Sequence, residues 1–435
     1  MTNLIQPQRW IPGADLLIST AAIAVAILLL APIGFGPLPA HAQTFSVIHS
    51  FSRSDGWYPD AGLTIDHAGN LYGTTAYGGN GTYNGTVFKL THHGSGWVLS
   101  ELYRFNGGDD GETPGARVVF GPDGKLYGSA VSGGSGGYGV VFSLQLPAST
   151  CKSASCPWTE TALFPFQLSG TGWEPIGDLA FDAAGNIYGT TFYGPLNNCE
   201  GEGCGVLYEL TQSGGVWTES ILHQFTGGTD SEFPTSVILD DAGNLYGTAQ
   251  GDPYNHLNPG LVFQFVSSGG SWTENVLHQF QFQGTDGDGP VGGLIFDAAG
   301  NLYGSTVSGG YYGAGTVYEL SPSGNYWRFS SLYSFARGAA YYPEGPLDAL
   351  IMDGAGNLYG ATGTDGDYGQ GAVFKLTPSN GGWTYTSLYD FTGGTDGSFP
   401  RNVVMDASGN LYGITTYGGN SACQAGCGVV FEITP

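Results

Sequence analysis

Five aspartates occupy comparable places in a loop that recurs along the chain, between a Phe that ends one segment and a Pro that begins the next. They are Asp55, Asp110, Asp230, Asp286 and Asp396. Carboxylate oxygens suit Ca²⁺, and a surface that combines carboxylates with exposed aromatic rings can bind sugars. Asp in a loop is also ordinary turn chemistry, and no Asp-x-Asp-x-Asp-Gly calcium loop is present. A ligand role, with Ca²⁺ as a possible cofactor, and a turn role both stay open.

A second group of loops carries tyrosines with adjacent glycines, at Tyr77, Tyr193, Tyr311 and Tyr417. Aromatic side chains are frequent in recognition surfaces because they combine a large apolar face with a polar tip. These four tyrosines join the five aspartates as candidate ligand-binding residues if the fold brings both groups of loops to one face.

The histidines do not assemble a catalytic site in the sequence. His49, His223 and His278 share one repeated position, and an interchange with aromatic residues there indicates packing. The other repeats carry Tyr103, Phe164, Tyr333 and Tyr389 at that position. No Gly-x-Ser-x-Gly elbow, His-Glu-x-x-His pair or phosphate loop is present. The irregular segments 195–205, 251–259 and 339–346 pair no evident nucleophile with a base. We therefore assign no catalytic residue.

Six cysteines form three local pairs: Cys151 with Cys156, Cys199 with Cys204, and Cys423 with Cys427. Cysteines this close in sequence most simply pair with each other. A zinc site would need Cys-x-x-Cys spacing or a nearby histidine, and neither is found beside these pairs. The spacing favours three disulfides that pin loops, and it favours an oxidising compartment over a metal site.

One short stretch, GNLYGTT at residues 69–75, organises the chain. It recurs with small changes at intervals of 53 to 61 residues, which indicates a single repeat architecture. The further copies begin at Gly124, Gly185, Gly243, Gly300, Gly356 and Gly409. Each repeat contains four strand patterns, called A to D here. In the first repeat they cover residues 62–66, 71–77, 86–91 and 97–105, because β-branched and aromatic residues alternate there between Gly, Asn and Asp clusters.

The turn between strands A and B begins with an aspartate, Asp66 in the first repeat, and contains a glycine where a left-handed conformation is needed. The equivalents are Asp182, Asp240, Asp297, Asp353 and Asp406. A turn role is sufficient for these residues without a metal. The Tyr-Gly pair of strand B predicts a packing layer, with the glycine allowing a neighbouring backbone to approach closely.

The number of strands predicts how the fold closes. There are seven C strands but six complete Trp-to-Phe D strands, and the chain stops just after the seventh C strand. The segment 45–51 resembles the end of a D strand and precedes the first A strand. We therefore predict an all-β fold, a seven-bladed β-propeller of four-stranded blades, closed by the N-terminal strand completing the last blade. In such a fold the D–A and B–C loops share one face, which would bring the aspartates and tyrosines together.

Charge and the N-terminal segment bear on location. The net charge of −25 argues against a nucleic-acid partner and suits solubility, cations, cationic partners or neutral glycans. Residues 1–42 contain an Arg, an apolar run and Ala-His-Ala, the pattern of a secretory signal peptide. We expect a propeller over 43–435 with no membrane span, a monomer that is secreted, periplasmic or on the cell surface.

The motif Asp-x-x-Gly-Asn-Leu-Tyr-Gly-Thr-Thr, followed by Gly-Thr-Val-Phe-Lys-Leu, resembles the GloVer (Gloeobacter/Verrucomicrobia-type) choice-of-anchor tandem repeat over residues 45–435. The resemblance implies export and a repeat architecture, and it implies no activity. No hydrophobic or sorting segment follows Pro435, which favours free secretion or periplasmic residence.

Taken together, the sequence predicts a secreted, non-catalytic binding or structural module that recognises an extracellular glycan or protein on its loop face. The alternative is a polysaccharide hydrolase or lyase with its site in the central funnel, since fold alone does not decide function.

Overall fold

The computed structural model describes residues 43–435 except 80–82, 147–157, 196–197, 253–257 and 337–344. The segment 1–42, for which a signal peptide is predicted, lies outside the described residues. Cys151 and Cys156, for which a disulfide is predicted, also lie outside them. Residues Gln43–Pro435 form one compact unit. No helix in this part of the chain is long and apolar enough to cross a membrane.

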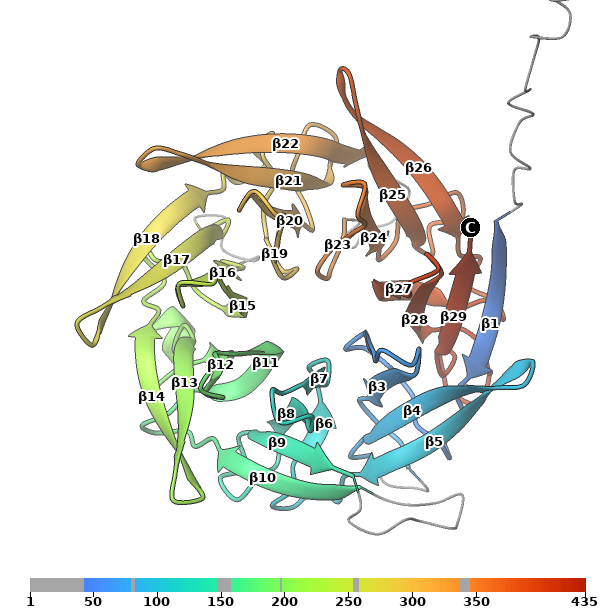
Figure 1. The fold of residues 1–435 in the computed structure, drawn as a ribbon, viewed down its shortest axis with the longest axis horizontal. Helices are drawn as coiled ribbons and strands as arrows, with labels where there is room; N and C mark the ends of the chain where they lie inside the picture. Colours follow the sequence, from blue (N-terminus) through green and yellow to red (C-terminus); the bar gives the residue numbers. More distant parts are fainter. Residues whose placement is uncertain (1–42, 80–82, 147–157, 196–197, 253–257, 337–344) are drawn as a thin grey trace, which may run out of the picture. The chain divides into compact units, whose positions relative to one another are not determined.

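Seven antiparallel sheets follow one another around a ring, each forming one blade of a propeller (Figure 1). Blade 1 contains β2 (Leu63–Ile65), β3 (Leu71–Thr75), β4 (Thr86–His93) and β5 (Gly96–Arg104). Blade 2 has a divided inner strand, β6 (Glu112–Pro114) and β7 (Val119–Phe120), then β8 (Leu126–Ser132), β9 (Val140–Gln145) and β10 (Thr159–Pro165). Blade 3 contains β11 (Trp173–Phe181), β12 (Ile187–Tyr193), the short 3₁₀ helix η1 (Cys199–Gly201), β13 (Val206–Ser213) and β14 (Val216–Gln224).

The remaining blades keep the same order from the channel outwards. Blade 4 contains β15 (Pro234–Leu239), β16 (Leu245–Ala249), β17 (Leu261–Ser268) and β18 (Ser271–Gln279). Blade 5 contains β19 (Ile295–Phe296), β20 (Leu302–Thr306), β21 (Gly313–Ser323) and β22 (Tyr326–Ala336). Blade 6 contains β23 (Ile351–Met352), β24 (Leu358–Thr362), β25 (Ala372–Ser379) and β26 (Gly382–Asp390). Blade 7 contains β27 (Ser398–Met405), β28 (Leu411–Tyr417), β29 (Val429–Thr434) and β1 (Thr44–Ser50).

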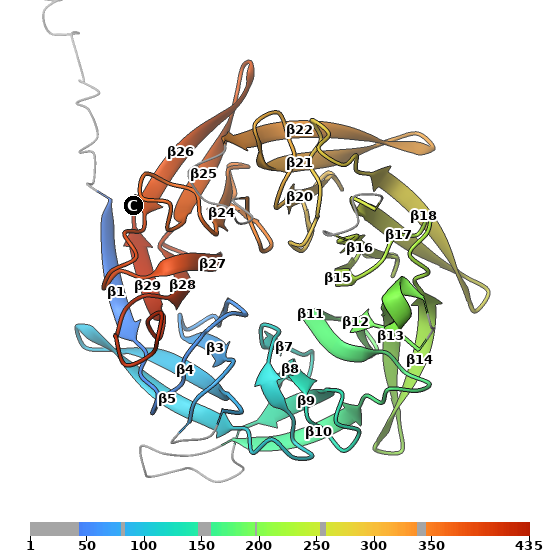
Figure 2. The ribbon, with the colours of Figure 1, turned by 180° about the vertical axis from the view of Figure 1, so that it is seen from behind.

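The closure of the ring is confirmed. Strand β1 pairs antiparallel with β29, with Thr44 opposite Thr434 and Ser50 opposite Val429. The two ends of the propeller therefore lie side by side in one blade, as Figures 1 and 2 show from opposite sides. The predicted all-β, seven-bladed fold of four-stranded blades is correct. The first repeat also has its four strands where they were expected, within two residues at each end.

The turn role of the A–B aspartates is borne out by their hydrogen bonds. Asp66 accepts from the backbone amides of Ala68 and Asn70, both at 2.9 Å, and from the Tyr72 hydroxyl at 2.9 Å. Burial on its own would raise the pKa of Asp66, but hydrogen bonds led by that from Asn70 lower it. The same pattern recurs at Asp182, Asp240, Asp297, Asp353 and Asp406.

The glycine after each strand B tyrosine is needed for close packing, but its neighbour differs from the prediction. A Cβ on Gly73 would lie 2.6 Å from Cζ of Phe88, and one on Gly413 would lie 2.3 Å from Cζ of Phe431. The close approach is thus mainly made by an aromatic ring of strand C, because that side chain crosses over strand B to reach the core. Only Gly247 also meets a backbone atom at this distance among these glycines, the Ser236 carbonyl at 2.3 Å.

The hydrophobic core lies between adjacent blades. Tyr72 and Val87 of blade 1, for example, pack with Val118, Leu126 and Phe142 of blade 2. The outermost strands add a second set of contacts from blade to blade. Three of these contacts are stacked rings: His278 on Phe329 at 4.1 Å, Tyr333 on Tyr385 at 4.8 Å, and Tyr389 on Phe45 at 3.7 Å. In each pair the second aromatic side chain belongs to the following blade of the propeller.

Candidate functional site

The D–A and B–C loops adjoin each other, and the surface they form is called the loop face here. Backbone hydrogen bonds join each D–A loop to the B–C loop of the preceding blade. Examples are Phe233 N to the Cys204 carbonyl at 2.8 Å and Phe399 N to the Gln370 carbonyl at 2.9 Å. The two groups of predicted site residues therefore do come from neighbouring loops.

The donors of these hydrogen bonds have an unusual backbone. Five non-glycine residues directly before the proline that opens strand A have a positive φ of 56° to 59°: Tyr58, Thr113, Glu174, Phe233 and Phe399. Such a conformation costs about 1–3 kcal/mol for a residue with a Cβ. It turns the amide N–H toward the preceding blade, so the strain is explained by a contact that holds two blades together.

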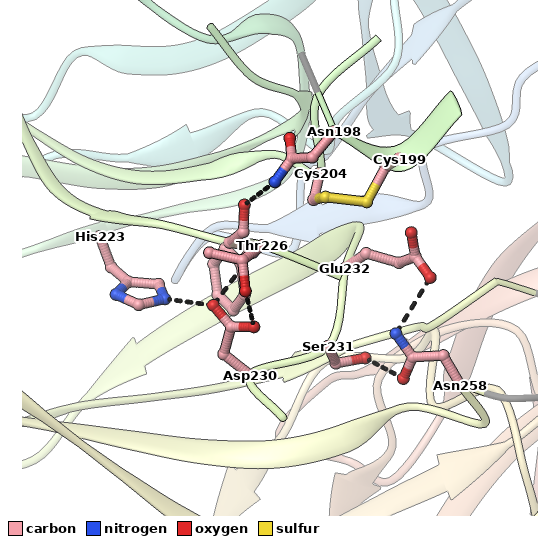
Figure 3. The surroundings of a disulfide bond; sticks show 10 residues. Asn198, Cys199, Cys204, His223, Thr226, Asp230, Ser231, Glu232 and Asn258 are labelled. Carbon is pink, nitrogen blue, oxygen red and sulfur yellow. Dashed lines mark hydrogen bonds and ion pairs between the residues drawn. A yellow bond between two sulfur atoms is a disulfide. The ribbon is translucent and has the colours of Figure 1, made fainter. Parts of the chain in front are cut away.

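Four of the five predicted D–A aspartates cap their own loop. Asp230 accepts from the Thr226 amide at 3.0 Å, the Thr226 hydroxyl at 2.6 Å and His223 Nε2 at 3.1 Å (Figure 3). Asp396 accepts in the same way from Thr392 and Tyr389. Burial alone would raise the pKa of Asp230, but hydrogen bonds led by that from His223 lower it.

Asp55 and Asp110 follow this pattern, whereas among the described residues Asp286 accepts only from strand D, and Asp288 caps that loop by accepting from the Gln283 amide at 3.0 Å. The three aspartates lie in separate blades. Asp55 accepts from the Ser52 amide at 2.7 Å and His49 at 3.0 Å. Asp110 accepts from the Asn106 amide at 2.8 Å and the Tyr103 hydroxyl at 2.9 Å, and Asp286 accepts from His278 at 2.9 Å. The three histidines thus hold a loop carboxylate as well as packing against aromatic rings.

The loop that follows blade 2 has no aspartate, and strand D of that blade has no hydrogen-bond donor at the matching position. In blade 2 the strand D position is Phe164, which has no donor, and the loop carries Thr171 in place of an aspartate. The Thr171 hydroxyl accepts from the Gln167 amide at 2.8 Å and donates to the Gln167 carbonyl at 2.9 Å. In the D–A loops that the structure describes, the donor on strand D and the carboxylate in the loop are therefore present together or, after blade 2, replaced together.

The predicted tyrosines belong to aromatic clusters on the loop face. Tyr77 and Tyr417 both contact Tyr58, at ring distances of 5.9 and 5.2 Å, where blade 7 meets blade 1. Tyr193 stacks on Trp173 at 4.1 Å in blade 3. Tyr311 differs from these three because 74% of its surface is exposed.

A groove of about 700 Å³ lies beside Tyr311, between the loops of blades 4 and 5. Three exposed aromatic side chains line it: Phe282, Tyr311 and Tyr312, with exposed fractions of 40%, 74% and 58%. Its polar lining includes Gln250, Asp252, Gln283 and Asp288. Tyr311 was predicted from the sequence as a site residue, whereas Tyr312 and Phe282 were not. Two features of the sequence could have pointed to them: two adjacent tyrosines in a B–C loop, and an extra Phe after the one that ends strand D.

Two of the three predicted disulfides are present in the described part of the chain, Cys199–Cys204 and Cys423–Cys427. The third, between Cys151 and Cys156, falls in the segment 147–157 outside the described residues, so it stays a prediction.

The first of these disulfides packs against the next D–A loop, since a Cβ on Gly227 would lie 2.7 Å from Cys199 Sγ. Glu232 lies close to the sulfurs of Cys199 and Cys204, a grouping that could resemble a metal site. Because the two sulfurs are bonded to each other, they offer no thiolate for a metal.

The central channel holds charged residues that the sequence analysis did not select. Arg117 and Asp178 form an ion pair at 2.5 Å, and Arg401 lies 3.3 Å from both Asp60 and Asp348. Burial raises the pKa of Asp348, and Arg401 opposes this effect. These five residues all follow the proline that opens strand A. Only 11% of the residues in the chain are charged, so this repeated placement of charged residues could have indicated the channel site from the sequence.

The sequence matches the Gloeobacter/Verrucomicrobia repeat over residues 38–258, 150–349 and 255–435. The chain belongs to this repeat family. No curated protein matches the sequence of this Gloeobacter/Verrucomicrobia repeat protein.

Several solved structures are similar to the repeat protein at low sequence identity. One is the extracellular domain assigned to a hybrid two-component system of B. thetaiotaomicron, with 10% identity, 89% of this chain covered and a TM-score of 0.51; the match spans 40% of that chain. Another is a gluconolactonase from Xanthomonas campestris, with 15% identity, 80% and 94% of the two chains covered and a TM-score of 0.43. A protein of unknown function from Dyadobacter fermentans matches with 11% identity, coverages of 89% and 96%, and a TM-score of 0.44.

Proposed function

We propose that this propeller is an exported, non-catalytic module that binds a neutral extracellular glycan in the loop-face groove between blades 4 and 5. The observation that carries the proposal is the set of exposed rings, Phe282, Tyr311 and Tyr312, beside amide and carboxylate side chains in one groove. Apolar sugar faces pack on aromatic rings, and sugar hydroxyls bond to amides and carboxylates.

The composition supports this choice of ligand and location. With a net charge of −25 the protein repels polyanions, so a neutral glycan fits better than an acidic one. Two disulfides are typical of proteins in oxidising compartments, which supports export to the periplasm, the cell surface or the medium.

Calcium has a smaller part in the proposal than the sequence suggested. The five D–A aspartates lie one per blade, and each already accepts a hydrogen bond from its own loop or from the strand before it. We therefore expect glycan binding to be the same with Ca²⁺ and with a chelator.

The test is a glycan-array screen of the purified protein, followed by titration of any bound sugar against the double variant Tyr311→Ala with Tyr312→Ala. Losing two stacking rings should weaken binding at least ~10-fold, since each aromatic contact contributes about 0.5–1.5 kcal/mol beyond its buried area. Tyr326→Ala is the matched control, because Tyr326 is 66% exposed but begins β22 at the tip of the C–D hairpin. Equal binding by the double variant would contradict the proposal, and cleavage of the bound sugar would favour the polysaccharide hydrolase or lyase.

A further inference from the structure

The inner strands enclose a second cavity, which is separate from the loop-face groove. Strand A residues of blades 2 to 7 surround a channel space of about 470 Å³. This volume falls within the range of roughly 300–1,000 Å³ that is usual for small-molecule sites. A polymer is excluded by this size, so the cavity is suited to a different class of ligand from the groove.

The channel wall is unlike the rest of the propeller because its residues differ from blade to blade. Where strand A begins, blades 2, 3 and 4 present Arg117, Asp178 and Ser236, whereas blades 5 and 6 present Gly293 and Ala349. Strand B, by contrast, keeps nearly the same residues in all seven repeats. The polar residues of blades 2 to 4 therefore face the small residues of blades 5 and 6, which leave space across the channel.

Further along the same strands the wall becomes apolar. The residues that line the cavity there are Val119, Ile238, Ile295 and Ile351. The cavity thus has a polar end and an apolar end, which selects a ligand with one polar group and a hydrocarbon body.

Two polar atoms at the polar end lack a partner within the protein. Ser236 is 8% exposed, and its hydroxyl makes no hydrogen bond. Nε of Arg117 is buried and also unpaired, although the other end of the guanidinium bonds to Asp178. Buried polar groups in native proteins almost always have a partner, so two unpaired groups beside one cavity are available to bond a polar group of a ligand.

The charges on this wall, Arg117 and Asp178, and those of the nearby Arg401 group determine the charge of the ligand. The charge of Arg117 is matched by Asp178 at 2.5 Å, and that of Arg401 is matched by Asp60 and Asp348. Neither guanidinium is left to balance an anion. We infer that the channel binds an uncharged small molecule with a hydroxyl or carboxamide group held by Ser236 and Arg117, and with a ring or chain packed against the isoleucines.

The test uses benzyl alcohol and benzamide as probes, with benzoate as the charged comparison, and measures binding to the protein by saturation-transfer NMR titration. Both uncharged probes should bind saturably, and benzoate should bind at least ~10-fold more weakly because the site has no free positive charge. Ala349→Leu should fill the space and abolish binding of both probes. Ser236→Ala should weaken benzyl alcohol about 3- to 10-fold, the usual effect of one hydrogen bond.

Two controls separate this inference from the loop-face site and from misfolding. Tyr311→Ala should leave probe binding unchanged, so a failed glycan proposal and a failed channel proposal give different results. A crystal soaked with benzamide should show it between Ser236 and Ile295, and this readout needs no variant. No saturable binding, or equal binding by Ala349→Leu, would overturn the inference.

Discussion

Three largely buried glutamates should make the stability of this propeller fall as the pH rises from acidic to neutral. Glu160, Glu219 and Glu274 stand two residues after the strand D Trp, the position that Phe329 and Tyr385 hold in the stacked ring contacts of blades 5 and 6. One carboxylate oxygen of each glutamate is buried without a hydrogen-bond partner. Carboxylic acids thus replace aromatic rings at three successive blade contacts.

The surroundings of these glutamates disfavour the charged form. Burial, with the nearby Asp110 carboxylate, raises the pKa of Glu160 from 4.5 to about 7. Burial raises the pKa of Glu219 to about 7 as well. The pKa of Glu274 is also raised by burial, although His223 at 3.9 Å opposes this and Asp230 adds to it.

The sign and size of the effect follow from proton linkage. An acid with a raised pKa in the folded state contributes stability that is complete below the unfolded pKa near 4.5 and is lost as the pH rises through 7. For Glu160 and Glu219 the full shift corresponds to ~3 kcal/mol each. Because these two side chains are only partly buried, screening by water reduces this to about 1–2 kcal/mol each.

The assay is urea unfolding followed by tryptophan fluorescence at pH 4 and pH 8. Glu219→Gln should raise the free energy of unfolding at pH 8 by about 1–2 kcal/mol and change it little at pH 4, below the unfolded pKa. Glu101→Gln is the control, because Glu101 lies on the outer strand of blade 1 and is paired with Arg104 at 2.7 Å. Burial lowers the pKa of His278, so the contribution of His278 to stability rises with pH, opposite to that of the glutamates. The difference between Glu219→Gln and wild type at one pH is therefore the quantity that tests the prediction. The same stability for wild type and Glu219→Gln at pH 8 would refute the reasoning.

Three further outcomes are expected. Replacing Cys199 and Cys204 together with serine should lower the free energy of unfolding by about 2 kcal/mol, measured by urea titration against the disulfide-bonded wild type. Deleting Thr44–Ser50 should leave β29 as an open edge and cause aggregation or a large loss of thermal stability, and a normal melting curve would show that the closure is dispensable. Thr113→Gly should stabilise the protein by ~1 kcal/mol by relieving its positive φ, whereas Thr91→Gly in the regular strand β4 should destabilise it by a similar amount.

The fold could be predicted from the sequence because its determinants are local and repeated. Asp66, for instance, bonds to residues two to six positions away, so its turn is visible in one short motif. The closure could be predicted because a missing D strand at one end matched a spare strand at the other.

The candidate sites were harder to predict because their residues belong to different blades and come together only when the propeller has formed. Arg117 and Asp178 are 61 positions apart and lie in different blades, so no motif joins them. The D–A aspartates were correctly placed in loops, but whether a carboxylate points outward or back toward its own strand depends on the strand D residue beside it. His223 decides this for Asp230, and that geometry is set by packing between blades.

The pairing of β1 with β29 has a consequence for how the chain reaches its native state. The first strand of the propeller has its partner in β29, so the last blade cannot form until residues 429–434 have been synthesised and every other blade has been placed. Folding therefore ends on the contact of longest sequence separation, which makes it slow. Until then β1 and β29 both have free edges, and two chains that are close together can exchange first strands. Dilute refolding should give closed single rings, whereas crowded refolding should give strand-exchanged dimers that persist.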